Sequence, residues 1–299
     1  MAYLEERVRN GKTYYYAKES YREEGKVKTR TLAYLGANKK EAEKQLKAIN
    51  NNHILTEEEL HEVERTRNAY SQLLAEIDEH TLQDIERDFF TTFVNQTNQL
   101  EGSTFTLKES KLLLEDNIVP KGKDLREVYE QVNTKKLFEA HQKKAFRITE
   151  KDIIAIHTLF VENIDKRVGY RTRPARILGS TTKTSPPEYI KTDMKLLIDW
   201  YKTHKKALHP LALAALFHAK FEQIHPFADG NGRVGRFIAY IMLEKHMPIL
   251  FPSRVEYLDA LEASQNKPLD STKREDFEPI LTYFMTAHQD TYNTFYRHY

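Results

Sequence analysis

LHPLALAALFHAKFEQIHPFADGNGRVGRFIAYIML, residues 208–243, contains two apolar segments with helical spacing on either side of a polar loop. Residues that recur at intervals of three and four predict one buried helix before the loop and another after it. They are Leu208, Leu211, Ala212, Ala215, Phe217, Phe221 and Ile224, followed by Phe237, Ile238, Ile241, Met242 and Leu243. We therefore expect two core helices joined by HPFADGNGRVGR, residues 225–236.

The polar loop has the composition of a phosphate site. A helix that begins at Asn231 or Gly232 leaves the backbone N–H groups of Gly230, Asn231 and Gly232 without helical partners. These amides and the positive end of the helix dipole attract an anion. Arg233 and Arg236 lie three residues apart, on the same side of the first turn, and the fork of donors on a guanidinium group suits phosphate oxygens.

Two further residues of the loop add catalytic potential. Asp229 can hold a divalent cation, because hard cations prefer oxygen ligands. His225 can serve as a general base, since its ordinary pKa of about 6.5 suits removal of a proton from a hydroxyl. Taken singly, each of these residues is typical of an ordinary turn between helices. Two arginines at a helix N-terminus, where the dipole disfavours cations, favour an anion between them.

The remaining sequence predicts a mainly α protein with a small β meander at its start. Residues 3–36 hold β-branched and aromatic residues broken at Asn10-Gly11 and Glu24-Gly25, which hairpin turns favour. Helical periodicity follows, with capping spacing at Thr56/Glu59 and Thr149/Asp152. The expected helices cover about 38–49, 56–77, 81–100, 107–115, 124–146, 149–163, 193–204, 209–224, 231–246, 254–265 and 276–297. The run YRTRPARILGSTTKTSPPEY, residues 170–189, predicts a hairpin or an ordered loop.

Composition excludes several classes of function. The 299 residues carry a formal charge of +2, which is not that of a strongly basic nucleic-acid binder. There is no cysteine, so disulfides, thiolate nucleophiles and cysteine-ligated metals are excluded. The first residues are charged where a signal peptide is apolar, and no run of about 18 apolar residues occurs. We expect a cytoplasmic protein that does not bind a membrane.

HPFADGNGRVGR resembles in full the signature of the Fic (filamentation induced by cAMP) family, H-x-F-x-D/E-G-N-G-R-x-x-R. The resemblance extends over about residues 81–265 and implies a helical bundle with a β-hairpin flap. The implied activity is transfer of AMP from ATP to a Ser, Thr or Tyr hydroxyl of a target protein, or of the protein itself. His225 would deprotonate that hydroxyl, Phe227 would anchor the loop in the core, and Asp229 would bind Mg²⁺ on the phosphates.

The same resemblance implies that the residues at the end of the signature bind the nucleotide. Gly230, Asn231 and Gly232 would form the anion hole, Arg233 would hold phosphate, and Arg236 would hold the γ-phosphate. The lysine that marks the related death-on-curing toxins, which transfer phosphate, is absent because position 232 is Gly. This difference favours transfer of AMP.

A second motif is similar to the inhibitory motif of this family, S/T-x-x-x-E-G/N. Thr97, Glu101 and Gly102 match it in TNQLEG, N-terminal to the core helices. The resemblance implies that Glu101 pairs with Arg236 and hinders productive seating of the γ-phosphate, since an Arg–carboxylate pair competes with an Arg–phosphate pair. By itself, the pattern is also typical of a surface glutamate beside a glycine at a helix end.

The flap and the first module have weaker signals. The short extended core Arg176, Ile177, Leu178 could pair edge to edge with a target segment, although an ordinary surface hairpin has the same pattern. Residues 1–50 hold 12 Lys/Arg against 7 Asp/Glu, with tyrosines interleaved. Because sheets need aromatic residues for cross-strand packing, we do not expect nucleic acid as a partner. Target recognition or a homodimer contact is favoured for this module.

These observations divide the chain into four parts and leave three functions to separate. The parts are a β-rich module with its following helix (1–50), a helical segment with the inhibitory motif (51–105), the Fic core (106–265) and a C-terminal helix (266–299). The favoured function is an autoinhibited adenylyltransferase. The alternatives are an enzyme that removes AMP, alone or as a second activity of the same site, and a nucleotide-binding regulator without catalysis.

Overall fold

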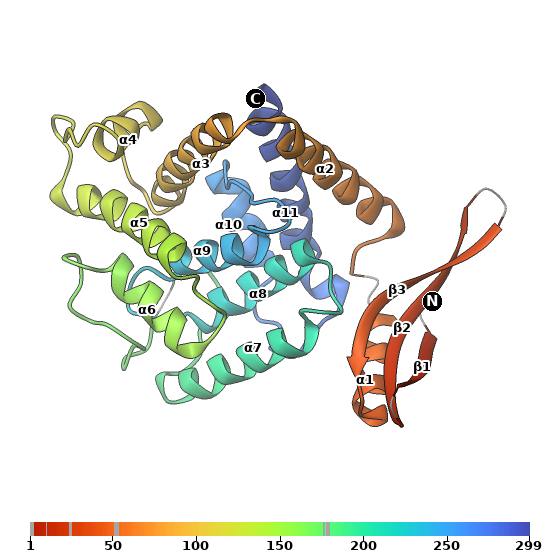
Figure 1. The fold of residues 1–299 in the computed structure, drawn as a ribbon. Coiled ribbons are helices and arrows are strands. Elements are labelled where there is room, and N and C mark those ends of the chain that lie inside the picture. Colours follow the sequence, from red (N-terminus) through yellow and green to blue (C-terminus); the bar gives the residue numbers. More distant parts are fainter. Residues whose placement is uncertain (1–2, 10, 24–25, 51–53, 176, 178–179) are drawn as a thin grey trace.

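The computed structural model describes residues 3–9, 11–23, 26–50, 54–175, 177 and 180–299. Figure 1 shows a large helical bundle, with a small β-module to one side of it. The predicted mainly α class and the three-stranded meander are both confirmed. Within the described ranges, no helix combines the length and the apolar character that crossing a membrane requires.

The small module is an antiparallel sheet covered on one face by a helix. Its strands, in the order β1-β2-β3, are β1 (Tyr3–Arg9), β2 (Lys12–Glu23) and β3 (Lys26–Gly36), and the helix is α1 (Lys39–Asn50). Successive strand residues point to opposite faces. Tyr15, Ala17 and Leu35 are therefore buried together with Ala42 of α1, in a small core of their own.

Among the described residues from 54 onward, ten further helices form the bundle. They are α2 (Glu57–Glu76), α3 (Glu79–Leu100), α4 (Leu107–Leu114), α5 (Leu125–Lys143), α6 (Glu150–Phe160), α7 (Ile190–His204), α8 (Pro210–Ile224), α9 (Asn231–Leu243), α10 (Arg254–Ala263) and α11 (Arg274–Thr294), with short 3₁₀ turns at Pro187–Tyr189 and Tyr296–His298. Several start at side-chain caps. Thr56 and Glu59 form the predicted reciprocal capping box of α2, and Thr149 accepts from the amide of Asp152 as expected.

Helices α8 and α9 lie in the middle of the bundle (Figure 1). Nearly every side chain of α8 is buried, because the bundle covers it on all sides. A methyl group at Gly235 of α9 would come within 2.6 Å of the Glu222 carboxyl and 2.8 Å of the His218 ring. Only glycine therefore allows α9 to lie this close to α8, and this contact places the loop between them.

The segment between α6 and α7 was expected to be a β-hairpin or an ordered loop, and most of its expected extended core lies outside the described residues. Its described residues, from 161 to 186, contain neither helix nor strand. The helix predicted for 149–163 ends at Phe160, and Asn163 adopts a positive φ of 61° that a continuing helix cannot contain. Of the three residues proposed to pair with a target, Arg176 and Leu178 lie outside the described residues, and Ile177 is half-buried.

Phe138 of α5 lies at the centre of an aromatic cluster. Its ring centroid is 4.6 Å from that of Phe90, 4.9 Å from that of Tyr240 and 5.1 Å from that of Phe237. The cluster joins α3, α5 and α9.

Replacing Phe138 by Ala is expected to lower the free energy of unfolding by about 3–5 kcal/mol, because truncating a buried aromatic ring leaves a cavity. Urea unfolding followed by circular dichroism measures the change. Leu196→Ala on the exposed face of α7 is the control, with an expected change below about 0.5 kcal/mol. Equal effects of the two substitutions would contradict the packing described for Phe138.

Candidate functional site

The loop between α8 and α9 begins and ends with left-handed backbone. His225 has a φ of 52° and caps the C-terminus of α8, and Gly230 has a φ of 80° and precedes α9. Helix α9 starts at Asn231, as predicted. Within the described part of the chain, no side chain caps the first amides of α9. The first amides of α9 thus have no side-chain partner there, whereas the Gly230 amide, which the sequence predicted to be free, donates to Asp229 Oδ1 at 2.7 Å.

Asn231 and Phe227 hold the loop in shape. The Asn231 side chain accepts from the Phe227 amide at 2.9 Å and donates to the Phe227 carbonyl at 2.9 Å. The Phe227 ring is fully buried and stacks on His157, with ring centroids 3.8 Å apart. The His157 Nε2 atom lies 3.1 Å from the Asp229 carbonyl oxygen. The amide side chain of Asn231 is therefore engaged within the loop, and only its backbone can contact a ligand.

His225 faces an open cavity of about 710 Å³, lined by residues 167–175 and by Ala228. Burial lowers the pKa of its imidazole, so the ring is neutral at pH 7 and has a lone pair for a proton. Arg171 lines the same cavity and donates from Nε to the His225 carbonyl at 2.8 Å and from Nη2 to the Ser185 carbonyl at 2.5 Å. It thus joins both ends of the segment 171–185 to the histidine.

Asp229 already has cationic partners. Its Oδ2 atom lies 2.5 Å from Nη2 of Arg126, at the start of α5, and its Oδ1 atom lies 3.4 Å from Nη2 of Arg233. Arg233 is buried, and its Nη1 atom lies 3.1 Å from the Glu130 carboxylate. The two arginines of the signature therefore point to different partners, because Arg236 contacts α3 instead of α5.

Arg236 is fully buried, with acceptors from two other helices. Its Nε donates to the Thr97 hydroxyl at 2.8 Å and its Nη2 to the Thr97 carbonyl at 2.9 Å. Nη2 also lies 2.5 Å from the Glu101 carboxylate, and Nη1 donates to the Tyr257 hydroxyl at 3.1 Å. The pairing of Glu101 with Arg236 that the inhibitory motif implied is thus present. Gly102 ends α3 with a φ of 102°.

The Glu101 carboxylate lies directly against the start of α9. A Cβ added at Gly232 would overlap with the Glu101 Oε1 atom and would lie 2.9 Å from Arg236 Nη1. Burial acts to raise the pKa of Glu101, but the Arg236 guanidinium outweighs it, and the net shift is downward. An ionised carboxylate therefore stands beside the helix start, where its dipole favours negative charge.

Several side chains that contact the loop or its arginines were missed by sequence reasoning. They include Arg126, Glu130, His157, Arg171 and Tyr257. Each lies in a segment without a motif, and Arg126, for example, is 103 residues from its partner Asp229. The only local signal was that Arg171 precedes the Pro-rich run. In a single sequence, residues that reach the loop from helices α5 and α6 cannot be told apart from other polar and charged residues of those helices.

Comparisons with known proteins agree with this geometry. Residues 147–243 match the model of the Fic/DOC family, and residues 5–68 match that of the IS1634 family transposase, N-terminal domain. A protein adenylyltransferase fic-1 of Caenorhabditis elegans is 28% identical over 193 residues, which are 60% of this chain and 37% of the relative. A protein adenylyltransferase Fic of Nematostella vectensis is 28% identical over 189 residues, 60% of this chain and 44% of the relative. The chain thus spans less than half the length of these relatives.

Solved structures share the fold. A Fic domain containing signaling protein from Bacteroides thetaiotaomicron superposes with a TM-score of 0.69 and 25% identity, covering 78% of this chain and 94% of that one. Fic-1 from C. elegans gives a TM-score of 0.69 at 22% identity, covering 80% and 72%. A helical bundle with a polar loop between two central helices is the arrangement of a Fic-type domain. Residues 147–243 of the chain form a domain that matches the Fic/DOC family.

Glu222 is a buried carboxyl group behind the loop. Its Oε2 atom lies 3.9 Å from Nδ1 of His225, and its Oε1 atom has no hydrogen-bond partner among the described residues. Burial raises its pKa to about 8. An unfolded glutamate titrates near pH 4.3, so folding takes up a proton between about pH 4 and pH 8.

We expect this proton uptake to make wild-type stability fall as the pH rises through that window. Glu222→Gln cannot titrate, so the free energy of unfolding of the variant minus that of wild type should increase from pH 5 to pH 8 and level off above it. Urea titrations at four pH values measure the difference. A difference that is constant over this range would mean that Glu222 is ionised in the folded protein at neutral pH.

Proposed function

We propose that the protein is an autoinhibited adenylyltransferase that transfers AMP from ATP to a hydroxyl side chain of a protein. The observation that carries the proposal is the position of the Glu101 carboxylate, paired with Arg236 beside the start of α9. His225 lies at the other end of the same loop and faces an open cavity. The names of the curated relatives support the reaction type.

In the proposed reaction, His225 takes the proton of the target hydroxyl. The hydroxyl oxygen then bonds to the α-phosphorus of ATP, the bond from this phosphorus to the bridging oxygen of the β-phosphate breaks, and pyrophosphate leaves. Positioning and stabilisation of charge account for most catalysis of this kind. The amides of Gly230, Asn231 and Gly232 and the guanidinium of Arg233 would supply that stabilisation.

Asp229 is the residue that would hold Mg²⁺. A single carboxylate fits this ion, which commonly keeps several waters and takes its other ligands from substrate phosphates. In the structure the carboxylate is partly exposed and pairs with Arg126, whose side chain is itself exposed and also lies 3.1 Å from the Glu130 carboxylate. The ion would neutralise charge on the phosphates, and Arg126 would exchange its partner when ATP and Mg²⁺ bind.

Inhibition follows from competition for Arg236. A guanidinium that is held by a carboxylate at 2.5 Å is not available to a γ-phosphate, and the carboxylate repels that phosphate. Thr97 and Tyr257 would continue to satisfy the buried guanidinium if Glu101 were absent. Loss of the glutamate therefore frees one donor of a guanidinium that three neutral acceptors still hold in place.

Glu101→Gly is expected to raise labelling of protein from [α-³²P]ATP by about 10- to 100-fold, the effect of removing one charge-assisted competitor. Adding His225→Ala should lower it by at least about 10²-fold, the usual worth of a general base. The control is Glu76→Gly, which changes the last residue of α2, far from this loop in sequence. Unchanged labelling in Glu101→Gly would exclude the inhibitory role.

The same experiment separates the alternatives. Glu101 is ionised and its side chain is 38% exposed, so it could instead orient a water that removes AMP from a modified protein. Release of AMP from a pre-labelled protein by wild type, lost in Glu101→Gly, would identify that activity. Tight ATP binding by every variant, with no AMP added to any protein, would identify a regulator without catalysis.

For the flap we propose a role in target binding. The segment 171–185 is anchored by Arg171 and by a bond from the Thr184 hydroxyl to the Ala175 carbonyl at 2.8 Å. Its far part contacts the end of α10, where the Thr181 amide donates to Glu262 at 2.8 Å. A segment fixed at both ends beside His225 could align an extended target with the catalytic histidine.

A further inference from the structure

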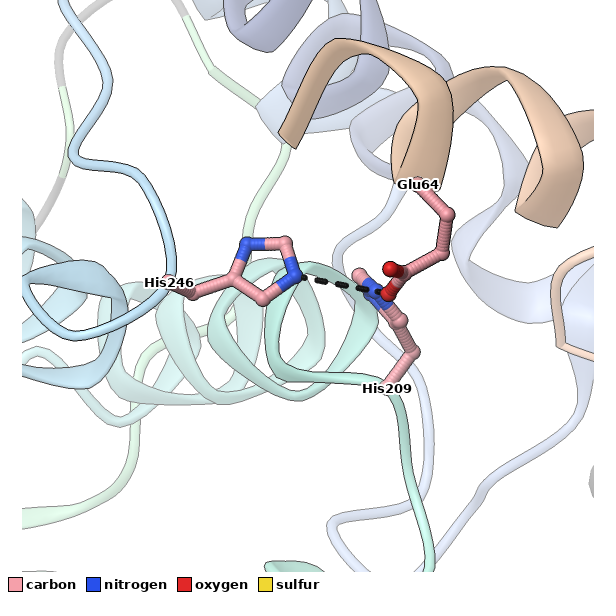
Figure 2. Close-up of side chains that lie close together, drawn as sticks. All are labelled: Glu64, His209 and His246. Atoms are coloured by element: carbon pink, nitrogen blue, oxygen red, sulfur yellow. Dashed lines mark hydrogen bonds and ion pairs between the residues drawn. The ribbon is translucent and has the colours of Figure 1, made fainter. Parts of the chain in front are cut away.

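Three side chains from distant parts of the chain meet at the end of α8 opposite to His225. His209 is the N-cap of α8, Glu64 lies on α2, and His246 follows α9. Figure 2 shows the carboxylate of Glu64 next to the His209 ring, with the His246 ring pointing at it. The cluster is separated from the loop at His225 by the 15 residues of α8, which correspond to about 22 Å along a helix axis.

The distances within the cluster match those between ligands of one small metal ion. The Glu64 Oε1 atom lies 3.0 Å from His209 Nε2 and 3.6 Å from His246 Nε2, and one ligand atom of each residue lies within 4.8 Å of the other two. Zinc binds such atoms at about 2.0–2.2 Å in tetrahedral geometry, which separates two ligands by roughly 3.3–3.6 Å. An ion fits among them after small side-chain movements.

A metal-free hydrogen-bonded cluster does not account for His246. Its side chain is only 10% exposed, and neither of its ring nitrogens has a hydrogen-bond partner among the described residues. Glu64 Oε1, the oxygen nearest to it, already accepts from His209. A buried polar group without a partner is costly, and a neutral imidazole aimed at a carboxylate is a ready metal ligand.

We propose that Glu64, His209 and His246 bind one Zn²⁺ ion, with water as the fourth ligand. Two imidazoles and a carboxylate form a ligand set that zinc uses in other proteins. The Glu64 side chain is 39% exposed, which gives the ion a path of entry and the water a place. Nitrogen ligands are poor for Mg²⁺, so this site would be distinct from that at Asp229.

Two contacts oppose the binding and limit its strength. The Arg67 guanidinium lies 3.8 Å from the Glu64 carboxylate, so a cation already stands beside one of the ligands. The Nδ1 atom of His209 accepts from the Leu211 amide at 3.2 Å in the first turn of α8. If Nε2 binds a metal, Nδ1 must carry the proton, and this hydrogen bond is lost. The loss is expected to lower the affinity by roughly ten- to a hundredfold. We therefore expect a moderate affinity rather than that of a permanent structural zinc.

Binding would stabilise the fold by joining three elements. The ion would connect α2 to the start of α8 and to the chain after α9. An ion that binds only the folded state raises its melting temperature with ion concentration.

The test uses the full chain after treatment with a chelator and buffer exchange. Isothermal titration with ZnCl₂ and metal analysis of the dialysed protein should give one Zn²⁺ per chain. Thermal unfolding with added ZnCl₂ should show a rise in melting temperature. His246→Gln and Glu64→Gln should each weaken the binding by about 100-fold or more, since each removes a ligand. MgCl₂ at the same concentrations should not bind at this cluster.

Two controls separate this site from others. His141→Gln alters a comparable pair, His141 with Glu244 at 2.8 Å, and should leave Zn²⁺ binding unchanged. The double variant His225→Ala, Asp229→Ala removes the candidate ligands of the loop and should also still bind one ion. Absence of binding by wild type, or equal binding by wild type and His246→Gln, would overturn the proposal. Glu64 is partly exposed, so Glu64→Gln serves as the second variant if His246→Gln does not fold.

Discussion

The guanidinium group of Arg236 has almost no contact with solvent, so it must find all its hydrogen-bond acceptors inside the protein. This requirement determines much of the arrangement of helices around α9. Desolvating a charge without partners costs several kcal/mol, so helices that supply acceptors must lie near it. Helix α3 supplies Thr97 and Glu101, and α10 supplies Tyr257. Tyr257 in turn lies 2.8 Å from Nε2 of His218 on α8. The polar chain thus joins four helices behind the loop.

This requirement also explains how one set of contacts can stabilise the fold and carry the proposed regulation. Three of the four acceptors of Arg236 come from Thr97 and Tyr257, and only the fourth is the partly exposed Glu101 carboxylate. The inner acceptors, on Thr97 and Tyr257, hold the guanidinium in place whether or not the outer acceptor, the Glu101 carboxylate, is bound to it. Under the proposed inhibition, the outer position would exchange a carboxylate for a phosphate while the helices stay packed. Because the carboxylate also lies against Gly232, both anions would compete for the same helix start.

Much of the fold followed from local sequence, and the reasons are specific. The capping box of Thr56 and Glu59 and the start of α9 at Asn231 were predicted because caps act over three or four residues. The contact of Glu101 with Arg236 was expected only through a resemblance, since 135 residues separate the pair. The partners Arg126 of Asp229 and Arg171 of His225 were not foreseen. Their positions depend on how α5 and the segment after α6 pack, and no local pattern records that.

The sequence by itself determined the chemistry of the loop: a histidine, an acid, glycines and two arginines at a helix start, within twelve residues. Backbone geometry over so short a range depends on neighbouring residues, which is why these features could be inferred without a structure. Only the tertiary structure decided which distant charges meet them. It placed Glu101 on Arg236, Arg126 on Asp229, and Glu64 beside His209 and His246. Such meetings depend on the packing of whole helices, because side chains far apart in the chain are brought together only when the core forms.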